Sequence, residues 1–89
     1  MSVRSILEEK LRTAFAPEWL EIVDESHRHV GHAGHRPEGE THFRVAIVSA
    51  DFAGKSRVER HRLVNAVLAE ELASHVHALA LKASAPGET

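Results

Sequence analysis

Histidine is the residue type with the greatest chemical potential in this sequence, because it accounts for 8 of the 89 residues. Four histidines fall within residues 26–40, and His77 lies in an alternating apolar run near the C-terminus. A neutral imidazole is a common ligand of transition metals. Judged by spacing alone, however, His77 is more simply a half-buried strand residue beside Leu79 and Leu81. The alternative for the four clustered histidines is that they merely bind stray divalent metals.

Several other kinds of chemistry are excluded by composition. The sequence has no cysteine, which excludes disulfides, zinc–thiolate sites, a thiol nucleophile and an iron–sulfur site built by this chain alone. The residue types of a catalytic triad occur in Asp24, Glu25, Ser26 and His27. Because neighbours on a strand point to alternate faces, these side chains cannot form a hydrogen-bonded relay. No phosphate loop or paired acid–base site is visible. We therefore expect no enzyme and no small-molecule substrate.

The densest basic cluster lies between residues 55 and 62. The formal net charge of -2 excludes bulk polycation behaviour, so affinity for nucleic acid must come from a local patch. Such a patch supports modest, salt-sensitive contact with duplex DNA. The alternative, which explains the basic cluster equally well, is a helix start whose charges are simply solvated. An apolar helix flank beside it could add a partner surface. The predicted partner- or DNA-binding residues are Lys55, Arg57, Arg60, Arg62, Leu63 and Val67, with Asp51 and Glu59 diluting the charge.

Hydrophobic periodicity predicts the elements that position these residues. Helical spacing of apolar residues indicates two amphipathic helices, the first of them ended by Pro17. Period-2 alternation indicates three strands, and Gly54 can supply a positive φ in a turn. In chain order, we expect helix 3–16, strand 19–25, loop 26–40, strand 42–49, turn 51–56, helix 57–73 and strand 75–82.

This order predicts an α+β fold in which a three-stranded mixed sheet carries its helices on one face. The first two strands should form a hairpin, with Leu20 and Ile22 on one face of the first strand. The inward residues of the second strand and of the long helix are then Phe43, Val45, Ile47, Val64, Leu68 and Leu72.

We expect one domain over residues 1–82, with a flexible C-terminal tail over 83–89. The first ten residues, MSVRSILEEK, carry several charges and lack the apolar core of a signal peptide. No later run approaches the length of a membrane span. A cytoplasmic protein without membrane contact is the expectation.

Five short motifs and the separate residues Phe52 and Gly54, in order and at compatible spacing, resemble those of the BolA family. The resemblance covers about residues 3–82, nearly the whole chain. The residues that carry the resemblance are Asp24-Glu25-Ser26, Thr41-His42-Phe43 with Val45, Ile47 and Ser49, then Phe52 and Gly54, Arg60-His61-Arg62, Ala69-Glu70-Glu71-Leu72 and Val76-His77-Ala78-Leu79.

The resemblance implies a fold similar to the class II KH domain and a monothiol glutaredoxin as partner. In the family, the two proteins share a [2Fe–2S] cluster, to which the glutaredoxin and glutathione contribute thiolates, and the BolA-like chain alone holds none. The histidine that serves as cluster ligand in the family corresponds to His77. The resemblance therefore favours a ligand at His77 over a structural strand residue. A loop histidine would be the second ligand: His29 matches best and His32 is the runner-up, ahead of His27 and His35.

The resemblance also implies an alternative, since some bacterial members are described as DNA-binding regulators of stress response and cell shape. KH domains clamp a nucleic-acid backbone with a GXXG loop. The corresponding turn here, Ala53-Gly54-Lys55-Ser56, lacks the second glycine, so duplex DNA is the alternative partner rather than single-stranded RNA. His61 is expected to be structural and His42 to face away from Phe43. A histidine-rich metal sensor remains a third hypothesis.

Overall fold

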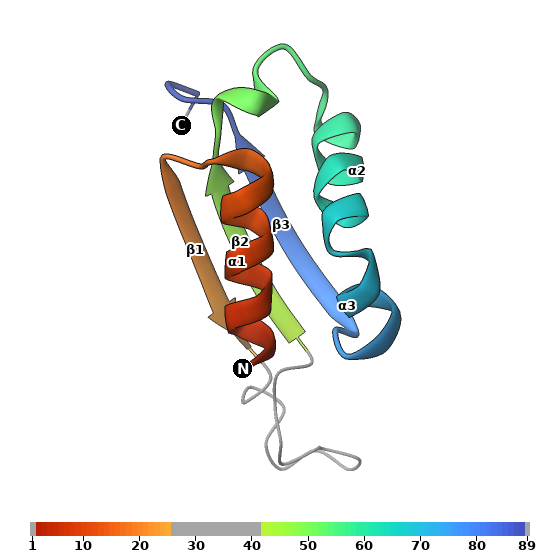
Figure 1. Ribbon diagram of the computed structural model, residues 1–89. Coiled ribbons are helices and arrows are strands. Elements are labelled where there is room, and N and C mark those ends of the chain that lie inside the picture. The colour runs from red at the N-terminus through yellow and green to blue at the C-terminus, as the bar shows by residue number, and fades with distance from the viewer. Residues whose placement is uncertain (1, 26–41, 89) are drawn as a thin grey trace.

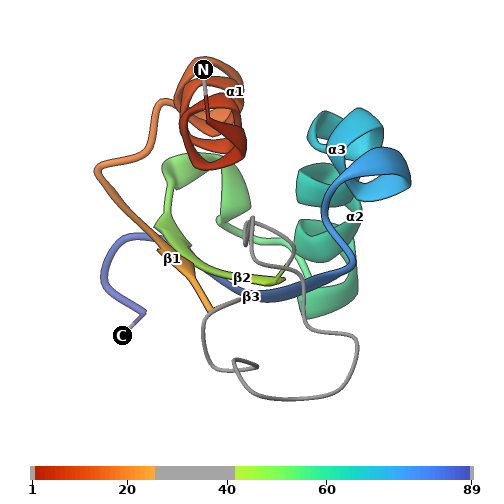
Figure 2. The same ribbon diagram turned by 90° about the horizontal axis from the view of Figure 1, so that it is seen from below.

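The fold is a single mixed sheet with helices on one face, as Figures 1 and 2 show. The computed structural model describes residues 2–25 and 42–88. The strand order is β1-β2-β3, with β1 antiparallel to β2 and β2 parallel to β3. The predicted α+β class and mixed sheet are therefore confirmed. The elements are α1 (Val3–Phe15), β1 (Trp19–Asp24), β2 (His42–Val48), the short 3₁₀ helix η2 (Ala50–Phe52), α2 (Arg57–Val67), α3 (Ala69–Ser74) and β3 (Ala78–Ser84).

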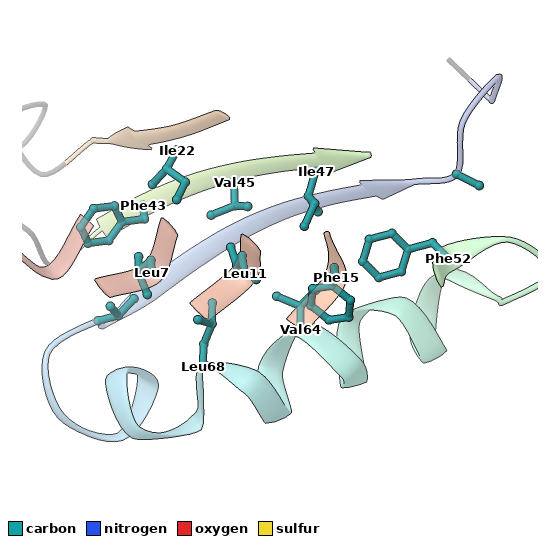
Figure 3. Close-up of a cluster of buried hydrophobic side chains, with 12 residues drawn as sticks. Leu7, Leu11, Phe15, Ile22, Phe43, Val45, Ile47, Phe52, Val64 and Leu68 are labelled. Atoms are coloured by element: carbon teal, nitrogen blue, oxygen red, sulfur yellow. The ribbon is translucent and has the colours of Figure 1, made fainter. Parts of the chain in front are cut away.

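The core lies between the sheet and the helices, and the strand register decides which residues enter it. Cross-strand pairs place alternate residues of β1, β2 and β3 on the helix-facing side, as the period of 2 requires. Figure 3 shows these side chains meeting those of α1, α2 and η2. The predicted inward residues are confirmed. The buried apolar residues are Leu7, Leu11, Phe15, Ile22, Phe43, Val45, Ile47, Phe52, Val64, Leu68, Val76 and Ala85.

Helix α1 begins and ends where its sequence predicts. The Ser2 hydroxyl accepts a hydrogen bond from the Ser5 backbone N–H at 3.0 Å, which caps the first turn. At the other end, Ala16 takes a left-handed conformation with φ 42°, and Pro17 follows. Within the described residues, no helix is both long enough and apolar enough to cross a membrane.

The predicted single helix over 57–73 is interrupted at Leu68, which divides it into α2 and α3. Leu68 leaves helical geometry with φ -100° and ψ 16°, although its side chain stays buried. The short α3 then places Glu71 against α1, where both of its carboxylate oxygens accept hydrogen bonds from Lys10 Nζ at 3.0 and 2.8 Å. This contact raises the pKa of Lys10. The ion pair thus joins the two helical segments that cover the sheet.

The third strand is displaced towards the C-terminus from its predicted range of 75–82. The backbone N–H groups of His75 and Val76 both donate to the Glu71 carbonyl, at 3.0 and 2.8 Å. Those groups complete α3 instead of pairing in the sheet, so β3 begins only at Ala78 and continues to Ser84. The expectation that pairing ends at Lys82 is wrong by two residues.

Ser49 joins three elements at the end of the core where β2 terminates. Its side chain is buried, and its Oγ donates to the Phe15 carbonyl at 2.8 Å. The same oxygen accepts from the Asp51 backbone N–H at 3.1 Å. Its own backbone N–H donates to the Ser84 carbonyl at 3.0 Å. One hydroxyl therefore satisfies the last carbonyl of α1 and starts η2.

We expect Ser49→Ala to lower the free energy of unfolding by about 1–2 kcal/mol, because it leaves the buried Phe15 carbonyl without its donor. Urea unfolding followed by circular dichroism measures this change. Ser74→Ala is the matched control, since its hydroxyl bonds the Glu70 carbonyl at an exposed helix end and should cost less than about 0.5 kcal/mol. Equal effects of the two substitutions would contradict the role given to Ser49.

Candidate metal-ligand and docking sites

His77 lies immediately before β3, at an exposed position between two fixed neighbours. Val76 is 3% exposed and anchors the chain in the core, and Ala78 pairs with His42 across the parallel strands. The sequence interpretation placed His77 on the strand itself; the strand begins one residue later. The backbone at His77 is nevertheless held from both sides.

The His77 ring is available to an external group. The residue is exposed, and among the described residues no hydrogen bond or ion pair engages its imidazole. The alternative expectation, a half-buried ring satisfied by a backbone carbonyl, is therefore wrong. An uncovered imidazole on an anchored backbone suits ligation of a metal supplied from outside.

Glu25 and His42, the described residues on either side of the segment 26–41, lie at the end of the sheet where β3 starts (Figure 1). The Glu25 backbone N–H donates to the His42 carbonyl at 2.8 Å. His42 in turn neighbours Ala78. The predicted second ligand, His29 or its runner-up His32, lies outside the described residues, as do His27 and His35. Within the described part of the chain, no three metal-ligating side chains come together.

The basic cluster forms at the other end of the molecule, around the start of α2. Ser56 and Glu59 make a reciprocal capping box, with the Ser56 N–H donating to the Glu59 carboxylate at 2.8 Å and the Glu59 N–H to Ser56 Oγ at 3.1 Å. Hydrogen bonding from the Ser56 backbone lowers the pKa of Glu59. The sequence interpretation missed this cap, although Ser56-Arg57-Val58-Glu59 fits the S-x-x-E pattern.

Arg60 is a partly buried anchor rather than a fully solvated charge. Its side chain is 13% exposed, and it donates to the carbonyls of Lys55 at 3.0 Å and Ala83 at 3.1 Å. It also makes a two-point ion pair with Glu88, at 2.6 and 2.8 Å. The guanidinium thereby joins the turn before α2 to β3 and to the residues after it.

Glu88 gives the C-terminal segment a defined position. Besides Arg60, its carboxylate accepts from the Ala85 backbone N–H at 3.0 Å. The hydrogen bond from Arg60 holds the pKa of Glu88 at about 2, below its ordinary 4.5. Because that pKa is depressed, the contribution of Glu88 to stability is complete above the ordinary value. It is lost progressively as the pH falls from the ordinary value through about 2, so the pair is retained throughout the physiological range.

The remaining predicted docking residues differ in exposure. Arg57 and Arg62 are exposed, and Lys55 Nζ donates to the Asp51 carbonyl at 2.9 Å. Leu63 is 37% exposed, whereas Val67 packs against the core. The flank therefore presents Leu63 to a partner but gives Val67 largely to the fold.

A hollow of about 590 Å³ lies beside this turn, between α2 and β3. We call it the basic hollow; it is lined by Lys55, Arg57, Arg60, His61, Leu81, Lys82, Ala83 and Ser84. His61 is half-buried there between helix and strand, at the place expected of a structural residue. Lys82 was not among the predicted residues. It lies far from the 55–62 cluster in the sequence, and only the tertiary fold brings it beside α2.

A second hollow of about 610 Å³ lies on the sheet and includes residues of all three strands. Trp19, which is 50% exposed, borders it, and Ala46 and Ala80 line it. The sequence interpretation missed this feature too. Its signal was weak, because Trp19 simply takes the outward position next to the inward Leu20.

The two candidate sites lie at opposite ends of β3. His77 precedes its first residue, while Arg60 bonds the Ala83 carbonyl near its last. Six residue steps at about 3.3 Å each separate these ends by about 20 Å. Figure 1 shows the start of α2 and the start of β3 at opposite ends of the molecule. The structure therefore places the candidate ligand and the candidate docking residues at different ends of the same strand.

A small α+β domain, with an exposed histidine at one end of its sheet and a cationic hollow at the other, is the class that this geometry defines. A family model described as BolA-like protein matches residues 11–88. The chain therefore belongs to the BolA family, as its motifs predicted.

Similar proteins with known sequences and structures agree with this assignment. The chain is 52% identical to the "DNA-binding transcriptional regulator BolA" of Escherichia coli over 81 residues, 91% of this chain and 73% of that protein. It is 51% identical to human "BolA-like protein 1", of which it spans 60%, with 97% of this chain aligned. The solved "BolA domain of SufE1 from Arabidopsis thaliana" superposes with a TM-score of 0.87 at 44% identity, covering 100% of this chain and 98% of that domain.

Proposed function

We propose that this protein is an adaptor that binds a monothiol glutaredoxin and contributes His77 to the coordination of a shared [2Fe–2S] cluster. Membership of the BolA family supports the choice of partner, as the resemblance implied. The observation that carries the proposal is the exposed His77 ring on a backbone fixed by Val76 and Ala78. In this proposal the cluster is cargo that the two proteins hold jointly for iron–sulfur delivery or iron regulation.

The side chains of this protein fit a cluster in which they provide only one or two of the ligands. It has no cysteine, so thiolates would come from the glutaredoxin and glutathione. Nitrogen ligands occur in Rieske centres, where they raise the reduction potential relative to all-thiolate clusters. His77 would supply that nitrogen from a rigid position, as a shared site requires.

His29 is the second ligand in this proposal, with His32 as its runner-up. The support is topological: both belong to the segment whose ends, Glu25 and His42, meet at the His77 end of the sheet. The basic turn and the exposed Leu63 lie about 20 Å from that end, a span that a standard interface of about 800 Å² per partner can cover. In this proposal they remain candidate docking surface for the glutaredoxin, beside their candidate role with DNA.

We expect His77→Ala to change the visible circular dichroism of the complex formed with a cluster-loaded monothiol glutaredoxin, because one cluster ligand is replaced. His75→Ala is the matched control, since His75 is exposed two residues earlier at the end of α3. It should leave the visible spectrum of the complex unchanged. A His77→Ala spectrum identical to that of the unaltered complex would rule out His77 as a ligand.

A second candidate function is duplex DNA binding by the basic hollow. Two observations favour it: the Escherichia coli relative is named as a DNA-binding regulator, and the hollow gathers Lys55, Arg57 and Lys82. These cations come from a turn, a helix start and a strand, so together they can follow a phosphate backbone.

We expect the double substitution Lys55→Glu and Arg57→Glu to weaken duplex binding and to reduce the slope of log affinity against log salt by about 2, since two phosphate contacts are lost. Fluorescence anisotropy of a labelled 20-base-pair duplex at several salt concentrations measures both effects. The double substitution Arg4→Glu and Arg12→Glu, at two exposed positions on α1, makes the same change in net charge and is the control. Equal losses in both proteins would show that the turn makes no specific contribution.

A further inference from the structure

The basic hollow already holds one anionic group at its edge, and that group belongs to the chain itself. The Glu88 carboxylate receives two hydrogen bonds from Arg60 and one from the Ala85 backbone N–H. This is a charge-assisted, two-point contact of the kind that guanidinium groups make with carboxylates and phosphates alike. Glu88 therefore occupies the donors that an external phosphate would use.

Arg60 does not need Glu88 to keep its position. Its Nε donates to the Lys55 carbonyl and its Nη1 to the Ala83 carbonyl. These two bonds direct the guanidinium from α2 across to β3 whatever lies beyond it. Loss of Glu88 would leave a preorganised cation beside the hollow, and preorganised donors bind anions at lower cost.

The Glu88 side is the more easily displaced partner. Its side chain is 42% exposed, compared with 13% for Arg60. It belongs to a short turn after β3 in which the Glu88 N–H donates to the Ala85 carbonyl at 3.2 Å. The displacement needs to involve only residues 86–88, because β3 ends at Ser84 and Ala85 is buried in the core.

We propose that Arg60 and the basic hollow form a phosphate-binding site whose intramolecular competitor is Glu88, so that backbone phosphates of duplex DNA bind by displacing the Glu88 carboxylate. The inference rests on the DNA-binding candidate and adds its regulation. Lys55, Arg57 and Lys82 line the same hollow and would receive phosphates beside the one on Arg60. Glu88 thereby lowers the affinity of the site for DNA, because a phosphate must compete with its carboxylate for Arg60.

The test compares Glu88→Gln with Glu9→Gln, which makes the same charge change at an exposed site on α1. We expect Glu88→Gln to tighten binding of the labelled 20-base-pair duplex about threefold, with a steeper salt dependence, and Glu9→Gln to have little effect. In an Arg60→Gln background the gain from Glu88→Gln should disappear, because the two residues act as a pair. Equal affinities of the Glu88→Gln and Glu9→Gln proteins would overturn the competition.

Nuclear magnetic resonance of the Arg60 Nε–H group, with inorganic pyrophosphate as probe, separates this inference from DNA binding itself. A pyrophosphate-induced shift that is larger in the Glu88→Gln protein supports the competition, even if no variant retains the duplex. The absence of duplex binding in every variant would then reject DNA as the occupant. An Arg60 signal that pyrophosphate shifts in neither protein would overturn the phosphate site.

Discussion

The parallel pairing of β2 with β3 is the constraint on which the rest of this structure depends. Pairs from His42–Ala78 to Val48–Ser84 fix which end of the sheet each candidate group occupies. His77 is held just before β3, whose first residue pairs with His42 at the start of β2. Arg60 bonds the opposite end. A one-residue change of register would turn every inward side chain outward, so burial of Phe43, Val45 and Ile47 protects both sites.

The connection between α3 and β3 determines that the His77 imidazole is exposed. Two backbone N–H groups converge on the Glu71 carbonyl, and the Glu71 carboxylate is bound by Lys10 of α1. Val76 then enters the core and the next residue leaves it. The position of His77 is thus a consequence of helix termination and core packing, and it requires no contact made by the ring itself.

Most of the fold follows from periodicity and turn chemistry, but the junctions do not. Alternation in β2 and the helical row Val64–Leu68 predicted the inward faces, because burial of apolar area outweighs local preference. The ion pair of Glu71 with Lys10 joins residues 61 positions apart, which no local pattern specifies. The division of the long helix at Leu68 and the start of β3 only at Ala78 likewise left no signal in the periodicity. The ordered position of Glu88 likewise depends on Arg60, 28 residues away.

The candidate sites were predictable in residue type more than in arrangement. His77, Lys55, Arg57 and Arg62 are exposed, whereas Arg60 bonds the carbonyls of Lys55 and Ala83; the roles given to them stay predictions. Their separation to opposite ends of β3 could not be read from the sequence, because it depends on strand direction. That separation places the two candidate sites on different surfaces of one small domain.

The most direct test of the central claim is electron–nuclear double resonance on the reduced complex with a cluster-loaded monothiol glutaredoxin, with ¹⁵N-histidine only in this chain. The account predicts a strongly coupled ¹⁵N signal that His77→Ala alters. Detection of no ¹⁵N coupling from this chain, or of a coupling that His77→Ala leaves intact, would contradict it.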